Sequence, residues 1–415
     1  EEVGAAIFQA TFFRGEVVAK ADVLEYAGGG QWDLYEVKSC SRSSYQKYLP
    51  DLAFTASAAR RAGVSLRSTF MITVNTQGTS DSGVSLFDTI DCTDELLKAQ
   101  EGLIQMLEES TVGESLDWAL QATEGQVPEA KALLHCKKCE LFSECVGKGL
   151  EHPIWELPRL SEKRFFELAS QSLEVRGIDS DGLTAPQVRH WRSVQDGGWV
   201  VDKKGLAKDL GKMSKPYLYL DFESCSGVRP LFRGVRPYQT VVTQYSLHIC
   251  DDIEGEAAHV DYLAEGGRDC RRELLERLLG DLGEEGSVVV YSSYEMTQLN
   301  ALAKLYPDLL PAVESVVSRL FDLEKVIKAH VSHPLFRGRS SLKVTLPVIV
   351  PEYEGKYAGM AVSDGGQASA RFSTISQGGL PEDELARLRQ ELLDYCELDT
   401  LAMLELHRAL AALAK

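Results

Sequence analysis

The sequence predicts an α/β protein with two domains joined by a helical connector. Strand-like runs, such as residues 217–220 and 287–291, alternate with helical patterns, such as Arg271–Leu282. At 415 residues the chain is long enough to bury two separate hydrophobic cores. We place the domains at residues 1–150 and 214–415, with the connector over residues 151–213.

Composition bears on the compartment and the partners. No apolar stretch is long enough to span a bilayer, so we expect no membrane partner. The nine cysteines, an odd number in a large chain, favour a reducing compartment, and we expect a cytoplasmic protein. The net charge of −18 is unfavourable for binding nucleic acid. Short basic clusters in loops near the acids described below offset that charge locally.

In the N-terminal domain, residues 6–24 predict a β-hairpin, and a third strand follows three glycines. Asp22 ends the second strand of the hairpin. Glu36 and Lys38 lie two residues apart on the third strand and therefore share a face. A helical pattern over residues 47–61 comes next, and two amphipathic helices are expected over residues 94–108 and 112–121.

Asp followed by Glu-x-Lys resembles the PD-(D/E)xK core of RecB-type nucleases, which have a restriction-endonuclease-like fold. This resemblance implies that Asp22 and Glu36 hold a metal ion and that Lys38 polarises water or steadies the scissile phosphate. The chain departs from the pattern in two respects. Thr55 stands where RecB-like modules usually carry Gln, and the acid-bearing helix that opens such modules is absent from the sequence. Without the resemblance, Glu-x-Lys is a common surface pair.

Three cysteines cluster near the end of this domain. Cys136, Cys139 and Cys145 have the spacing Cys-x2-Cys-x5-Cys, which puts three thiolates within reach of one soft metal centre. The triplet resembles that of RecB-like nucleases with an iron–sulfur staple, and this implies a [4Fe–4S] cluster whose fourth ligand lies upstream. Zn²⁺ held by the three thiolates and His135 is the alternative, and three reduced thiols in a lysine-rich loop is another.

The connector contains helical patterns over residues 164–174 and 185–194, and we interpret it as a spacer. The C-terminal domain carries two pairs of polar side chains. Asp221 and Glu223 end a strand-like run and point to one face, whereas Tyr395 and Asp399 lie one helical turn apart. Three carboxylates and a phenol suit two Mg²⁺ or Mn²⁺ ions. Hard cations prefer oxygen ligands, and two ions about 3.5–4 Å apart clamp the attacking and leaving oxygens of a phosphodiester.

The order of segments in this half resembles the ribonuclease H-like DEDD exonucleases, in the subgroup whose last motif carries Tyr. The resemblance covers residues 214–415 and implies a mixed central sheet. It also implies that Asp221, Glu223 and Asp399 bind metal, while Tyr395 orients the attacking water. Relatives place an Asp in the middle motif, and here we expect Glu295 to take that place as a metal ligand with a catalytic role. A solvated glutamate at a helix N-terminus is the alternative. Asp322 is a further acid that binds the metal or lies behind its ligands.

Further segments, including Arg236-Pro237-Tyr238-Gln239 and the run from Arg339 to Lys343, resemble a largely uncharacterised bacterial family. In that family a RecB-like module precedes an exonuclease-like domain. Lys343 and Arg236 are then candidates for binding phosphate, and Tyr238 is a candidate for base stacking. A solvated lysine and a core tyrosine are the alternatives.

The sequence thus predicts a metal-dependent nuclease that acts on DNA or RNA, with a 3′→5′ exonuclease centre in the C-terminal domain and a second centre in the N-terminal one. The rival hypothesis is a nucleic-acid-binding or assembly protein in which one or both centres are inactive. Glu295 in place of Asp, Thr55 in place of Gln and the acidic composition favour this rival.

Overall fold

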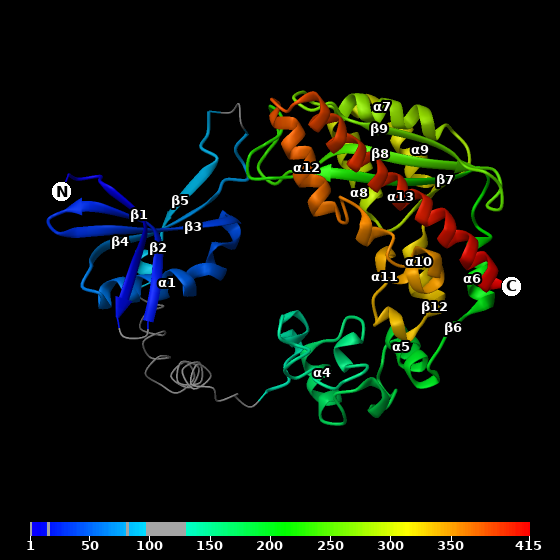
Figure 1. The fold of residues 1–415 in the computed structure, drawn as a ribbon, viewed down its shortest axis with the longest axis horizontal. Coiled ribbons are helices and arrows are strands. Elements are labelled where there is room, and N and C mark those ends of the chain that lie inside the picture. The colour runs from blue at the N-terminus through cyan, green and yellow to red at the C-terminus, as the bar shows by residue number, and fades with distance from the viewer. Residues whose placement is uncertain (1, 15–16, 80–82, 97–129) are drawn as a thin grey trace. The chain divides into compact units, whose positions relative to one another are not determined.

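The computed structural model describes residues 2–14, 17–79, 83–96 and 130–415, and it has mixed α/β architecture throughout (Figure 1). The chain divides into two compact units. The first consists of Glu1–Glu129 together with Ser226–Gln239, and the second of Ala130–Cys225 together with Thr240–Lys415. The α/β class predicted from the sequence is confirmed at this level. In this division the predicted connector and the cysteine segment group with the C-terminal sheet.

The first unit is built on one five-stranded sheet in the order β1-β2-β3-β4-β5. Its strands are Ala6–Arg14, Val17–Gly28, Gln31–Ser41, Ser65–Val74 and Phe87–Asp91. The pairs β1–β2, β2–β3 and β4–β5 are antiparallel, whereas β3 and β4 are parallel. The predicted hairpin and third strand are therefore confirmed. Gly28 at the end of β2 and the turn residues Gly29 and Gly30 all have positive φ, a conformation that other residues rarely adopt.

A crossover joins the parallel strands β3 and β4, as such a pair requires. It consists of the 3-10 helix η1 (Arg42–Tyr48) and helix α1 (Leu49–Arg61). Pro50 stands in the first turn of α1, and two arginines stand in the last turn, which favours helix ends at these positions. One face of α1, with Leu52, Ala56 and Thr55, is buried on the sheet. The helices predicted over residues 94–108 and 112–121 lie almost wholly outside the described residues.

The second unit begins with the cysteine segment, which contains the 3-10 helix η2 (Leu134–Lys138). A small helical layer follows, with its own apolar cluster around Trp155 and Phe165. Its elements are η3 (Ile154–Glu156), α4 (Glu162–Ala169), η4 (Val175–Gly177), α5 (Ala185–Asp196), β6 (Val200–Val201) and α6 (Lys203–Leu210). The Trp155 indole donates to the Leu133 carbonyl at 2.8 Å and so fixes the start of the cysteine segment to this layer.

The central sheet of the second unit has the strand order β11-β10-β7-β8-β9. Its strands are β7 (Tyr217–Cys225), β8 (Val241–Cys250), β9 (Ala258–Leu263), β10 (Ser287–Val290) and β11 (Leu320–Asp322). Strand β7 lies at the centre. Strand β7 is antiparallel to β8, and β8 is antiparallel to β9. On the other side, β10 is parallel to β7, and β11 is parallel to β10. The predicted mixed sheet is therefore present.

Helices cover this sheet and close the chain (Figure 1). They are α7 (Arg271–Leu282), α8 (Tyr294–Leu305), α9 (Leu310–Ser318), α10 (Leu323–His330), α11 (Leu342–Ile349), α12 (Gly365–Gln377) and α13 (Glu382–Ala414). The two-residue strand β12 (Val331–Ser332) pairs with β6. Short 3-10 turns are η5 (Pro307–Leu309), η6 (Pro334–Phe336), η7 (Pro351–Tyr353) and η8 (Tyr357–Gly359).

The last helix, α13, sets the position of the candidate site. Three acids in its first turn complement the helix dipole. Its buried side chains recur at helical spacing, and Leu388, Leu392, Tyr395 and Asp399 lie on one face. This face packs on β7 and β8. Within the described residues, no helix is both long enough and apolar enough to cross a membrane.

Candidate metal centre

Three acids from the middle strand and the last helix meet in the second unit. Asp221 and Glu223 lie two residues apart on β7, opposite Ser246 and Gln244 of β8. Asp399 approaches them from α13. Each acid offers one oxygen, and these oxygens all lie within 4.8 Å of one another. Among the residues that the structure describes, these three acids are the group of three or more His, Cys, Asp or Glu side chains whose ligand atoms come this close together.

Burial and mutual repulsion dominate the electrostatics of these acids. Asp399 is 7% exposed. Burial raises the pKa of Asp221 well above its usual range, and the charges of Asp399 and Glu223 raise it further. Burial and then the charge of Asp399 raise the pKa of Glu223 to about 8. A divalent cation relieves such repulsion, and the hard oxygen donors are those that Mg²⁺ or Mn²⁺ prefers.

A lysine and two tyrosines adjoin the acids. Lys343, at the start of α11, donates from Nζ to the Tyr395 hydroxyl at 2.8 Å and also bonds the carbonyl of Ser363. Its ammonium lies 4.7 Å from the centre of the Tyr395 ring and 4.9 Å from that of Tyr357. The Tyr357 hydroxyl donates to Oδ1 of Asp399 at 2.6 Å. Burial raises the pKa of both tyrosines, so both phenols remain hydrogen-bond donors at neutral pH.

Tyr357 and Cys396 adjoin the acids but are not among the site residues predicted from the sequence. Tyr357 lies in the turn η8, where no strand or helix period marks it out. Cys396, next to Tyr395 on α13, is fully buried, and its Sγ lies 3.5 Å from Oδ2 of Asp221. Its place between two predicted site residues was a usable signal.

Glu295 and Asp322 lie at the edge of this centre. Glu295, in the first turn of α8, is 3% exposed, and its Oε2 has no hydrogen-bond partner among the described residues. Burial raises its pKa to about 8, and its own charge raises the pKa of Asp221. It is not one of the three acids within 4.8 Å. Asp322 caps α10 by accepting from the backbone N–H of Lys325 at 3.3 Å, and it also accepts from Ser292 N–H at 3.2 Å.

In the first unit, Glu36 and Lys38 point to one face of β3 and contact each other. Lys38 Nζ lies 2.8 Å from Oε1 of Glu36. Glu36 is 6% exposed, and its Oε2 has no partner among the described residues. Burial raises the pKa of Glu36, and Asp22 is among the nearby charges that raise it further. Asp22 accepts from the Val37 N–H at 2.7 Å and from the Gln9 amide at 3.0 Å.

A further acid, Asp51, enters this group from the first turn of α1 and forms an ion pair with Lys38. Asp51 could not be predicted as a site residue, because an acid after a helix-initiating proline is ordinarily explained by the helix dipole. Thr55, one turn further along α1, is 4% exposed and packs in the core of this unit.

The cysteine triplet lies on turns before the helical layer of the second unit. Cys136 is partly buried, whereas Cys139, Cys145 and His135 are exposed. The Cys139 N–H donates to the Cys136 carbonyl at 2.9 Å. The three Sγ atoms do not all lie within 4.8 Å of one another. A four-iron cluster holds its thiolates further apart, and ligation by the triplet stays a prediction.

The remaining predicted substrate contacts lie in the 226–239 segment, which groups with the first unit. Arg236 is exposed, and its backbone N–H donates to the Gln239 side chain at 3.1 Å. Tyr238 has a φ of 60° and donates its hydroxyl to the Ser39 carbonyl of β3 at 2.9 Å. Lys343, by contrast, belongs to the second unit.

Comparison with known proteins identifies relatives of unknown function. Residues 218–341 match a family described as a domain of unknown function, DUF2779. An uncharacterized protein of Mycoplasma pneumoniae is 27% identical over 227 residues, which is 49% of this chain. One of Mycoplasma genitalium is 24% identical over 233 residues, or 52% of this chain. Each alignment covers 34% of the relative, so the chain spans about a third of the length of these proteins. No solved structure matches the chain.

Proposed function

We propose that the second unit is a metal-dependent nuclease of the ribonuclease H-like DEDD type. The observation that carries this proposal is the convergence of Asp221, Glu223 and Asp399 within 4.8 Å. The sheet supports it as well. Strands β7, β8 and β9 are successively antiparallel, and β7 lies at the centre of the five-stranded sheet. Strands β10 and β11 follow on its other side and are parallel to it. This is the strand order expected of a ribonuclease H-like domain.

Asp221, Glu223 and Asp399 would hold Mg²⁺ or Mn²⁺, and the orphaned oxygen of Glu295 makes it the candidate for a further ligand. The bound ions would activate water and stabilise charge on the phosphodiester. Asp399 is already oriented by the hydroxyl of Tyr357, and Asp221 sits on the central strand, where the sheet fixes its backbone. Because the acids are buried, they are poorly solvated and their affinity for a cation is high.

Tyr395 and Lys343 supply the polar groups beside the acids. The Tyr395 phenol is the group that would orient the attacking water, as the resemblance implies. The Lys343 ammonium donates hydrogen bonds to that phenol and to the Ser363 carbonyl. Its charge lowers the pKa of Glu223 and Asp399, against the effect of burial. An ammonium in this position would also attract a phosphate of the substrate. The proposed polarity is 3′→5′, which rests on the resemblance alone.

We propose a RecB-like PD-(D/E)xK module for the first unit. The β1-β2-β3-α1-β4 order, with β3 and β4 parallel, supports it, as does the buried pair of Glu36 and Lys38. We also propose a [4Fe–4S] cluster on Cys136, Cys139 and Cys145, which group with the second unit, with Zn²⁺ as the alternative.

One observation favours the second hypothesis for this unit, that it binds nucleic acid without cutting it. Lys38 forms ion pairs with both Glu36 and Asp51, which occupies the ammonium that a catalytic lysine would turn toward a phosphate. The buried Thr55, in place of Gln, points the same way.

The test is cleavage of labelled single-stranded DNA and RNA with Mn²⁺ by the full chain prepared without oxygen. We expect cleavage by the wild type and by Glu36→Gln, but not by Asp399→Asn. Loss of cleavage in Glu36→Gln with retention in Asp399→Asn would assign the activity to the first unit. An inactive wild type on both polymers would leave the binding hypothesis.

A further inference from the structure

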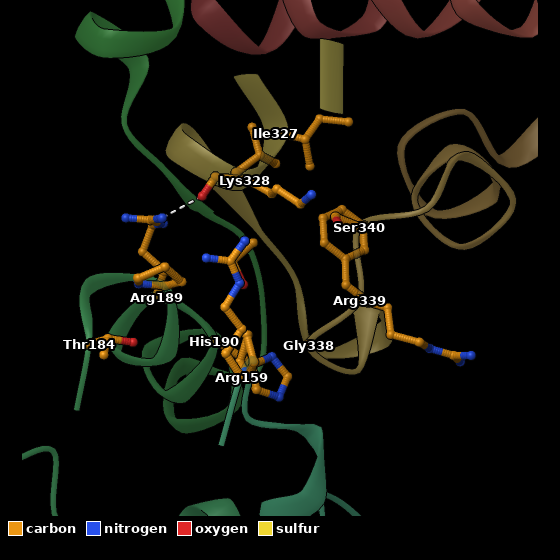
Figure 2. Close-up of a pocket in the computed structure, with 14 residues that line it drawn as sticks. Arg159, Thr184, Arg189, His190, Ile327, Lys328, Gly338, Arg339 and Ser340 are labelled. Carbon is orange, nitrogen blue, oxygen red and sulfur yellow. Dashed lines mark hydrogen bonds between the residues drawn. The ribbon is translucent and has the colours of Figure 1, made fainter. Parts of the chain in front are cut away.

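A cavity of about 430 Å³ lies in the second unit, apart from the acids. Helices α5 and α10 supply Arg189, His190 and Lys328, and the loop that follows η6 supplies Gly338 and Ser340 (Figure 2). Gly338 lets this loop close on the helical layer. Its φ is +68°, and a Cβ added there would lie 1.6 Å from the carbonyl oxygen of Glu156. The volume is in the range of small-molecule sites, which span about 300–1,000 Å³.

The cavity is lined by basic side chains, and none of its fourteen lining residues is an acid. This is unusual in a chain of net charge −18. The Arg189 guanidinium bonds the Lys328 carbonyl, and the Lys328 ammonium pairs with Glu324 at 2.7 Å. Arg159 has no ion-pair or side-chain hydrogen-bond partner in the parts of the chain that the structure describes. In Figure 2 the Arg159 and Arg189 guanidiniums both extend toward α10.

Two features of the lining cost free energy, and a ligand could relieve the second of them. Arg159 has a φ of 51°, a strained conformation for a residue with a side chain, and such strain gathers at functional sites. His190 is 2% exposed, and while its Nε2 lies 3.2 Å from Oε2 of Glu156, its Nδ1 is buried without a partner among the described residues. A buried nitrogen that lacks a partner costs free energy, which a polar ligand atom would recover.

Beside the basic groups and the hydroxyls of Thr184, Ser332 and Ser340, the lining has apolar side chains. Pro158 and Pro186 flank the basic groups, and Ile327, Val331 and Phe336 form the inner wall. Phe336 is 3% exposed and packs with Ile327 and Val331 in the core of the second unit, so this wall is part of a packed core. A purely inorganic anion would leave that surface uncovered, whereas a ligand with an apolar, planar body would cover it.

We propose that this cavity binds a phosphate monoester with a planar apolar body, namely a nucleoside monophosphate. The phosphate dianion would take hydrogen bonds from Arg159 and Arg189, since guanidinium groups match phosphate oxygens in charge and geometry. The base would lie on the apolar wall. The choice of a nucleotide rests on the proposed nuclease function. Ser340 of the cavity precedes Lys343 of the metal centre by three residues, so one short segment serves both sites.

The test is calorimetric titration of the full chain with AMP in EDTA, so that the acids bind no metal and cleavage plays no part. We expect saturable binding, with much weaker binding of adenosine and of inorganic phosphate. Arg159→Asn should weaken AMP binding at least tenfold, because it removes the guanidinium, and Asn tolerates positive φ. Arg192→Gln, an exposed position on α5 outside the cavity, is the matched control and should bind as the wild type does.

Asp221→Asn separates this site from the metal centre. AMP affinity unchanged in Asp221→Asn supports the cavity even if the wild type cleaves nothing. Affinity lost in Asp221→Asn but kept in Arg159→Asn would overturn the assignment, as would the absence of AMP binding. A 5′-phosphorylated oligonucleotide that competes with AMP supports the same chemistry and identifies a strand end as the ligand source, and failure to compete identifies the free nucleotide.

Discussion

Replacing Asp221 by Asn should stabilise the metal-free protein. The acids of the candidate centre lie within 4.8 Å of one another and are buried. Two full charges at that separation repel by about 3 kcal/mol at an effective dielectric constant of about 20. Because burial has already raised the pKa of these groups, their charges are partly neutralised at pH 8. The expected gain in unfolding free energy is therefore about 1–2 kcal/mol, or a few degrees in Tm.

Mn²⁺ should reverse the order of stability, so that the wild type becomes more stable than Asp221→Asn. An ion that binds only the folded state stabilises it by about 2.7 kcal/mol at a concentration of 100 Kd. The wild type gains this stabilisation, whereas Asp221→Asn loses a ligand and gains little. The assay is thermal unfolding at pH 8 in EDTA and in Mn²⁺. Asp394→Asn, which alters an exposed acid on the same helix α13, is the control and should shift Tm in neither condition.

A fall of several degrees in the Tm of metal-free Asp221→Asn would contradict this prediction. That result would mean that hydrogen bonds hold the carboxylate as a structural group. Equal stabilisation of the variant and the wild type by Mn²⁺ would also contradict the prediction.

Three further predictions concern the acids, the lysine and the cysteines. Without metal, the unfolding free energy should fall as pH rises from about 5 to about 8, because the folded state keeps protons on Glu223 and Glu295, whose pKa is raised to about 8, while the unfolded state releases them. Denaturant unfolding of wild type and Glu295→Gln measures this, and the variant should show the shallower fall; equal slopes contradict the assignment. Lys343→Met should slow cleavage about 10- to 100-fold, the size of a charge-assisted contact of about 1.5–3 kcal/mol, while calorimetry shows Mn²⁺ still binding; unaltered cleavage would make Lys343 a bystander. Protein prepared without oxygen should absorb visible light, and Cys139→Ala should lose that absorbance and lower Tm; a colourless protein with one Zn²⁺ would support the alternative with His135.

The period of strands and helices predicted which of the site residues share a face of one element. Asp221 and Glu223 share a strand face, and Tyr395 and Asp399 share a helix face, so each pair is fixed within its own element. Their meeting was anticipated from the order of the segments and the family resemblance. The hairpin of the first unit was equally local, since its glycine turn and alternating residues are contiguous.

Contacts between distant segments could not be predicted in this way. Tyr357 reaches Asp399 from an irregular turn, and Asp51 reaches Lys38 across a crossover. The segment Ser226–Gln239 lies between two strands of the second unit but groups with the first. Arg159 and Gly338 line the same basic cavity although they lie far apart in the sequence. In each case the partner is set by tertiary packing, which leaves no period in the sequence.

We propose that Asp221, Glu223 and Asp399 hold divalent metal. The most direct measurement is an anomalous difference map from crystals of the full chain grown with Mn²⁺. We predict a peak bounded by these three carboxylates, with a second peak toward Glu295, and loss of both peaks in Asp399→Asn. Crystals saturated with Mn²⁺ that show no anomalous density between the three carboxylates would contradict the account.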